Sequence, residues 1–285
     1  MTPQHGSRRA AFAGTWYPDD PQTLGAFVDR CLVPADVPFS PVLGVISPHA
    51  GVMYSGAVAG RAYASLRPSF TTARPDDWSP PEVVVLVGPS HSVAFHGAAL
   101  APDRHFETPL GPLKHDARLV EELASRPGIH LDSAVHAREH ALELQLPFLA
   151  RVLPEVPVVL LLMGRQTRSE VDRLAGSLTE VLRGRRALLV ASSDLSHYHD
   201  RKTAARLDAV VLECIERFDP DRLQSALEAS SQHACGGGPI VAVMRTARAL
   251  GATRSKVLQY ADSGDVSGDV ERVVGYVSAA LGGGA

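Results

Sequence analysis

The hydrophobic positions of this chain fall into short continuous runs separated by longer amphipathic segments. Apolar runs bounded by turn residues predict buried strands. They lie at Val42–Ile46, Val83–Val87, Val156–Met163, Ala187–Ala191, Val257–Tyr260 and Val273–Leu281. Several of these runs are continuous rather than alternating, which is typical of strands covered by helices on both faces.

Segments with helical periodicity fill most of the intervals between these runs. They lie at Pro21–Cys31, Gly56–Leu66, Asp116–Ala124, Glu139–Val152, Ser169–Leu182, Lys202–Phe218, Pro220–Ala229 and Pro239–Leu250. Ser169, followed three residues later by Asp172, is close to a capping box and predicts a helix start. The alternation of strand and helix predicts an α/β fold with a mixed or mainly parallel β-sheet flanked by helices. We expect a single domain over residues 1–285.

Composition narrows the class of protein. Of 285 residues, 45% are hydrophobic and 21% are charged, which is an ordinary globular balance. A net charge of −3 without a basic run gives no reason to expect a nucleic-acid partner. The 3 cysteines are an odd number at wide spacing, unlike a disulfide framework. Since there is neither a signal-like segment nor an apolar run of membrane-spanning length, we predict a soluble, cytoplasmic protein with no membrane partner.

Residues with metal-binding chemistry stand at the ends of predicted elements. His49 and His91 each follow a buried strand, and Cys235 precedes a glycine run that opens a helix. In open α/β sheets ligands bind beyond the carboxyl ends of strands. The positive end of a helix favours a thiolate, so we expect a lowered pKa for Cys235. Two imidazoles and a thiolate converging from different strands would form an open transition-metal site.

Two further pairs could add to that site. Asp194 and His197 follow the run Ala187–Ala191. Asp194 can orient an imidazole or act as a base, or it can be a helix N-cap beside an incidental histidine. His140 and Glu143 share a face if their segment is helical. That face either projects into the same site or is a polar helix start.

Taken together, these motifs resemble those of the Memo family, called AmmeMemoRadiSam system protein B in many prokaryotes. The matching stretches are Ala13–Tyr17, Pro48–Gly51 with Tyr54–Gly56, Leu86–His91, Glu139–Glu143 with Leu146–Pro147, Ser192–His197 and Cys235–Gly236. They occur in family order and cover essentially the whole chain.

The resemblance implies a fold similar to that of class III extradiol dioxygenases, the non-haem iron enzymes that cleave catechol rings. It also implies that His49, His91 and Cys235 match the metal-binding positions, with Asp194 and His197 lining the same pocket. The family is linked to iron and copper. Cys235 stands where the ring-cleaving enzymes have a carboxylate. The prokaryotic name implies a radical-SAM protein and a third component as partners.

Our leading hypothesis is a metal-dependent oxidoreductase that acts on an unknown small substrate. It would use iron (Fe²⁺), or else copper or zinc, with candidate catalytic residues His140, Glu143, Asp194 and His197. One alternative is a non-catalytic module that binds a peptide or protein in the same pocket. Another is a hydrolase that uses Cys235 or a zinc-bound water as nucleophile.

Overall fold

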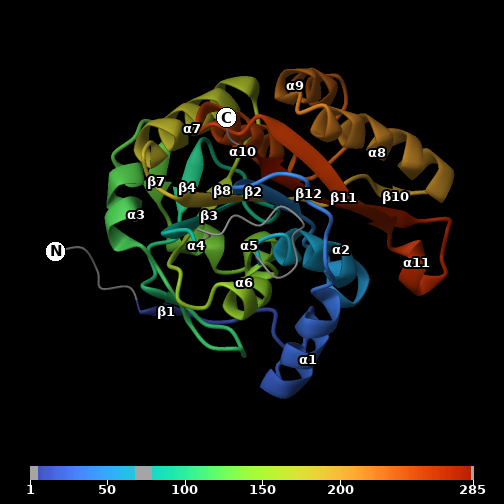
Figure 1. Ribbon diagram of the computed structural model, residues 1–285, viewed down its shortest axis with the longest axis horizontal. Helices are drawn as coiled ribbons and strands as arrows, with labels where there is room; N and C mark the ends of the chain where they lie inside the picture. The colour runs from blue at the N-terminus through green and yellow to red at the C-terminus, as the bar shows by residue number, and fades with distance from the viewer. Residues whose placement is uncertain (1–5, 68–78, 284–285) are drawn as a thin grey trace.

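A mixed sheet of nine strands runs through the protein in the computed structural model, which describes residues 6–67 and 79–283 (Figure 1). In spatial order these strands are β10 (His197–His199), β12 (Val273–Gly282), β2 (Val42–Ser47), β9 (Ala187–Ser192), β3 (Val83–Pro89), β8 (Val158–Met163), β4 (Ala98–Leu100) and β7 (Ile129–Leu131), and β11 (Arg254–Asp262) pairs with β12. The four central strands β2, β9, β3 and β8 are parallel, and β12 and β4 run antiparallel to them. The predicted mixed α/β fold is confirmed.

Helices cover both faces of this sheet (Figure 1). One face packs against α3 (Ala117–Ala124), α7 (Arg168–Leu182), α8 (Arg201–Glu216), α9 (Pro220–Ala229) and α10 (Gly237–Ala249). The other packs against α1 (Pro21–Cys31), α2 (Val52–Ala64), α4 (Ser133–His136), α5 (His140–Glu143) and α6 (Leu146–Val152). The short helix α11 (Gly264–Ser267) lies beside β11, and β1 (Ser7–Arg8), β5 (His105–Phe106) and β6 (Leu113–Lys114) form a small separate sheet.

The two faces explain the continuous apolar runs. Along β3, Val85 and Val87 belong to the core under α7 and α10, whereas Val84 and Leu86 belong to the core under α2 and α6. Successive side chains of a strand point to opposite faces, so a strand buried on both faces is apolar at every position.

Three helix predictions need correction. The segment predicted as one helix from Glu139 to Val152 is two helices, α5 and α6. Pro147 lies at the start of α6 and lacks the N–H that a continuous helix would donate to the carbonyl of Glu143. Helix α2 begins at Val52 rather than at Gly56, directly after the turn that carries His49. The N-cap of α7 is Thr167, not Ser169.

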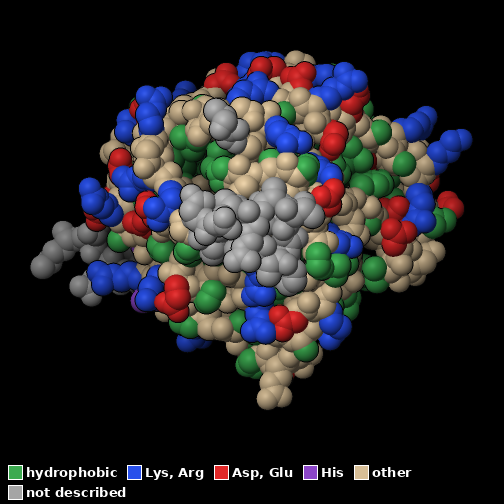
Figure 2. Space-filling model, in the orientation of Figure 1, with side chains coloured by type: hydrophobic (Ala, Val, Ile, Leu, Met, Phe, Trp, Pro, Cys, Tyr) green, Lys and Arg blue, Asp and Glu red, His purple; other side chains and the backbone are tan. Residues whose placement is uncertain are grey.

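The short strands β1, β4, β5, β6, β7 and β10 were not expected, because two or three residues carry too little periodicity to be recognised. On the surface, Figure 2 shows positive and negative side chains interspersed over one face of the molecule. Among the residues that the structure describes, no helix is both long enough and apolar enough to cross a membrane.

Candidate metal centre

Two strand ends and one helix start bring the three predicted ligands together. His49 lies just beyond β2, His91 lies just beyond β3, and Cys235 lies just before α10. One ligand atom from each of these side chains lies within 4.8 Å of the other two. His49 is buried, whereas the side chain of His91 is 31% exposed, so the group opens to solvent on the side of His91. This is the arrangement that the strand-end positions predicted.

Hydrogen bonds fix which nitrogen of His49 is available. Ser192 Oγ donates its proton to the carbonyl of Ala141 at 2.6 Å and accepts a bond from Gln145 Nε2 at 2.8 Å. The same hydroxyl lies 2.9 Å from His49 Nδ1. Since its only proton is already donated, it must accept from His49, which therefore carries its proton on Nδ1. Nε2 of His49 keeps a lone pair, and it lies 3.2 Å from Cys235 Sγ.

Glu139 fixes His91 in the same way. Its carboxylate accepts bonds from His91 Nδ1 at 2.9 Å, from the backbone N–H of His91 at 2.6 Å and from the N–H of Ala141 at 3.0 Å. Burial acts to raise the pKa of Glu139, but these bonds outweigh it and lower the pKa to about 2. An ionised carboxylate cannot donate, so His91 carries its proton on Nδ1 and presents Nε2. Carboxylate–histidine pairs of this kind orient the ligands of metal sites.

Cys235 is held by its backbone. Its carbonyl accepts a bond from Gln166 Nε2 at 2.8 Å, while Gln166 Oε1 accepts from the N–H of Gly238 at 2.7 Å. The N–H of Gly236 donates to Ser193 Oγ at 2.9 Å. These bonds tie the turn before α10 to the ends of β8 and β9.

The expectation of a lowered pKa at Cys235 is wrong for the metal-free site. Burial raises the pKa of this thiol, and the nearby carboxylate of Asp194 raises it further. Hydrogen bonds with the backbone of Asp194 and Gly236 and with the Ser193 hydroxyl act against this but are outweighed. Without a cation, Cys235 is therefore a neutral thiol whose S–H can donate to His49 Nε2. A metal ion in the site would supply the positive charge that the thiolate needs.

Asp194 holds the backbone of the turn that carries His49. It is buried, and its Oδ1 accepts the backbone N–H groups of His49 at 2.7 Å and of Ala50 at 3.3 Å. It is not a helix cap, since α8 is capped by Asp200. Burial raises the pKa of Asp194 above its ordinary value. His197 is partly exposed and its Nδ1 lies 2.8 Å from the carbonyl of Leu195, so that its ring is also fixed.

His140 lies at the edge of the group. Its ring stacks on His91 with centroids 4.5 Å apart, and its Nδ1 lies 3.3 Å from Glu139 Oε1. Trp16 covers it from the N-terminal segment, with ring centroids 4.4 Å apart. Burial, together with the charges of His49 and His91, lowers the pKa of His140 to about 4. It is therefore a neutral imidazole at pH 7.

Glu143 faces the N-terminal segment instead. Arg8 Nη1 donates to its Oε2 at 2.7 Å, and its Oε1 accepts the N–H of Phe12 at 2.7 Å and the hydroxyl of Tyr17 at 2.8 Å. Both oxygens are thus occupied in a buried ion pair that anchors the segment bearing Trp16. Its proposed part in proton transfer has no support in this geometry.

A second set of metal-ligand residue types also lies within 4.8 Å, namely His91, Glu139 and His140. Its two rings are stacked at an interplanar angle of 24°, so their lone pairs run side by side instead of converging. Its carboxylate is already occupied by N–H donors. This set is better described as the hydrogen-bonded support of His91.

The donor set of His49, His91 and Cys235 fits a transition-metal ion. A tetrahedral ion with metal–nitrogen and metal–sulfur bonds of about 2.0 and 2.3 Å places its donors about 3.5 Å apart. The separation of 3.2 Å between His49 Nε2 and Cys235 Sγ is close to this, and all three donor atoms lie within 4.8 Å of one another.

Sequence reasoning missed the supporting residues Glu139, Gln145, Ser192 and Gln166 as functional positions. Glu139 and Ser192 stand inside the recognisable motifs, one position before His140 and two positions before Asp194, and could have been singled out there. Gln166 carries no local signal, because its partners Cys235 and Gly238 lie 69 and 72 positions later in the chain.

Comparisons with known proteins agree with these motifs. A family model described as Memo-like protein matches residues 8–280. A MEMO1 family protein of Methanopyrus kandleri is 35% identical over 285 residues, covering 95% of this chain and 97% of that protein. One from Thermotoga maritima is 34% identical over 288 residues, covering 96% and 99%. An uncharacterized protein of Escherichia coli K12 has a similar fold, with a TM-score of 0.58, 14% identity and coverage of 85% of this chain and 100% of its own.

Proposed function

The chain belongs to the Memo family, and on that premise we propose that it is a metal-dependent oxidoreductase with iron or copper held by His49, His91 and Cys235. The observation that carries the proposal is the orientation of the donors. Each imidazole has its Nδ1 proton engaged, His49 on Ser192 and His91 on Glu139, so that both Nε2 lone pairs remain for a metal. Such preorganisation is typical of built metal sites.

The third donor makes copper a candidate beside iron. A thiolate is a softer ligand than a carboxylate, so a His₂Cys set suits copper at least as well as iron. Both ions, when bound, would supply one-electron chemistry at a position left open by three protein ligands. Iron remains our first candidate, and copper is its direct competitor.

One of the surrounding residues is suited to proton transfer. His140 is neutral at pH 7, and its Nδ1 lies 3.3 Å from Glu139 Oε1. With its proton on that nitrogen, its Nε2 would be the atom that accepts a proton from a substrate. Asp194 holds the His49 turn, and His197 stands beside the pocket. We assign proton transfer to His140 in preference to Glu143, whose oxygens are occupied.

One observation favours a second candidate, a cysteine hydrolase. Cys235 Sγ and His49 Nε2 are 3.2 Å apart, which is the spacing of a thiol and its general base. Against this, burial and Asp194 raise the pKa of the thiol, whereas a nucleophilic cysteine needs it lowered. The electrostatics therefore favour a metal ligand.

The test is anaerobic reconstitution with Fe²⁺ or with copper, followed by metal analysis and oxygen-uptake measurements in the presence of ascorbate. We expect about one metal per chain, and oxygen uptake above that of the free metal. His49→Ala and Cys235→Ser should lose both, whereas Cys214→Ala, a buried cysteine remote from the site, should keep both.

Equal metal content in all four proteins would show that the ligands are wrong. Full metal content without oxygen uptake would favour the non-catalytic binding module. Thiol-dependent hydrolysis of an ester by the metal-free protein would favour the hydrolase.

A further inference from the structure

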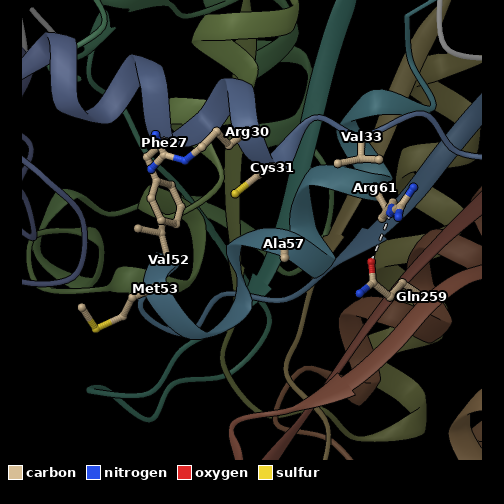
Figure 3. A pocket seen from close by; sticks show the side chains of 9 residues that line it. All are labelled: Phe27, Arg30, Cys31, Val33, Val52, Met53, Ala57, Arg61 and Gln259. Carbon is tan, nitrogen blue, oxygen red and sulfur yellow. Dashed lines mark hydrogen bonds between the residues drawn. The ribbon is translucent and has the colours of Figure 1, made fainter. Parts of the chain in front are cut away.

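A cavity of about 340 Å³ lies between α1, α2 and β11, apart from the metal centre (Figure 3). We call it the α1–α2 cavity. Its lining includes Val52, the first residue of α2, which follows the His49 turn. The lining shares no residue with the donor set of His49, His91 and Cys235. Its volume is in the range of small-molecule sites, about 300–1,000 Å³.

The apolar part of the lining comes mainly from two helices. Phe27 and Cys31 come from α1, and Val52, Met53 and Ala57 come from α2. Figure 3 shows the ring of Phe27 over Val52, with Cys31 Sγ and Ala57 between them and Arg61. Met53 is 64% exposed at the rim. A flat apolar body would find contacts on both helices here.

The charged part of the lining is entirely cationic. Arg30 and Arg61 contribute guanidinium groups, and the lining contains neither Asp nor Glu. Arg61 is held in place by the carbonyl of Pro34 and by Gln259 Oε1 at 3.3 Å. Arg30 is exposed and lies over the ring of Phe27, 5.6 Å from its centroid. In the part of the chain that the structure describes, neither guanidinium pairs with a carboxylate.

From this lining we infer that the α1–α2 cavity binds a small monoanion with a flat apolar body, its acidic group on Arg30 and its body against Phe27, Val52 and Ala57. An uncharged ligand would form no ion pair with the guanidinium groups, and an inorganic anion would make no contact with the apolar lining. Arg is well suited to such a role, because its guanidinium pairs with carboxylates and stacks on aromatic rings. The inference does not depend on metal at the other site.

Calorimetric titration with two probes of equal shape tests this directly. 2-Naphthoate carries the anion, and 2-naphthylmethanol lacks it. We expect naphthoate to bind about tenfold more tightly, the difference that a hydrogen bond to a charged group contributes. Arg30→Gln should remove this preference. Arg186→Gln, an exposed arginine that pairs with Glu82 outside the cavity, is the matched control and should retain it.

Two variants locate the probe. Ala57→Trp should fill the cavity and abolish binding of both probes, and thermal melting reports whether it folds. Met53→Glu places a carboxylate at the exposed rim, where it should weaken naphthoate binding and spare naphthylmethanol. Equal affinities for the two probes, or naphthoate binding unaffected by Arg30→Gln and Met53→Glu, would overturn the inference.

Discussion

At the scale of single residues, Glu139 decides which nitrogen of His91 a metal can reach. Glu139→Gln replaces the carboxylate with an amide that no longer enforces the Nδ1–H tautomer. We expect the metal affinity to fall about 10–100-fold, the usual effect of losing such a support, while the protein stays folded. Competition with a chromophoric chelator measures the change.

The chain offers a matched control for this substitution. Glu170 accepts a bond from His96 Nδ1 at 3.1 Å and from the N–H of Gly97 at 3.1 Å, in a pair of the same type outside the site. Glu170→Gln should leave metal affinity unchanged. If both variants lose affinity equally, or neither does, Glu139 has no specific role.

We expect Glu143 to stabilise the fold and to take no part in catalysis. Glu143→Gln removes the charge opposite the buried Arg8, so we expect the free energy of unfolding to fall by about 3–5 kcal/mol. Urea denaturation measures this, and metal content per folded chain should be unchanged. Normal stability with lost oxygen uptake would instead return Glu143 to the catalytic group.

The sequence singles out the candidate ligands better than it singles out the residues that support them. His49 and His91 were expected from a local rule, that functional residues lie beyond the carboxyl ends of strands, and Cys235 from the glycine run that opens a helix. The partner of Glu143 is Arg8, 135 positions earlier, so no spacing argument could reveal that this carboxylate is occupied. For the same reason, the raised pKa of Cys235 could not be read from its glycine-rich surroundings alone.

At the scale of elements, the start of α10 depends on a close approach between backbones. A Cβ added at Gly236 would lie 2.5 Å from the carbonyl oxygen of Ser192 and 2.8 Å from Ser193 Cβ. Gly236→Ala must therefore displace Cys235, and we expect it to weaken metal binding and lower stability. Chelator competition and thermal melting measure these effects.

Gly176 in the middle of α7 is the control for that substitution. A Cβ there meets nothing within 4 Å. Gly176→Ala should therefore stabilise the protein by about 1 kcal/mol, the gain expected when alanine replaces glycine inside a helix. A stabilising effect at both positions would mean that the turn before α10 is looser than we describe.

Helices and strands could be predicted from the sequence where the pattern of apolar residues extended over many positions. The predicted helix Pro21–Cys31 matches α1 residue for residue, and the central strands match to within a few positions. The break between α5 and α6 was missed because helical periodicity continues through Pro147, although the chain cannot donate the bond there. Nothing local marks β10, which forms only because β12 lies alongside it.

At the scale of the whole molecule, buried histidines should make the metal-free protein sensitive to acid. Burial lowers the pKa of His136 to about 4, and burial with neighbouring histidines does the same for His140. In the unfolded chain both take up protons from about pH 6.5 downward. The folded state takes up these protons only near pH 4, so between pH 6.5 and 4 the unfolded chain binds more protons than the folded one. The free energy of unfolding therefore keeps its full value above pH 6.5 and falls as the pH drops from 6.5 toward 4.

Between pH 6.5 and 4, each such histidine should lower the free energy of unfolding by up to about 1.4 kcal/mol per pH unit. Urea denaturation at several pH values measures the slope. His136→Gln should reduce it, and His105→Gln, at an exposed position, is the control. A stability profile that is flat between pH 7 and 4 would contradict this assignment.

The central claim is a metal held by two imidazoles and one thiolate, and X-ray absorption at the metal edge of the anaerobically reconstituted protein tests it most directly. We predict one sulfur at about 2.3 Å and two nitrogens at about 2.0–2.1 Å. The sulfur should be absent from the spectrum of Cys235→Ser. A first coordination shell of nitrogen and oxygen alone in the parent protein would contradict the account.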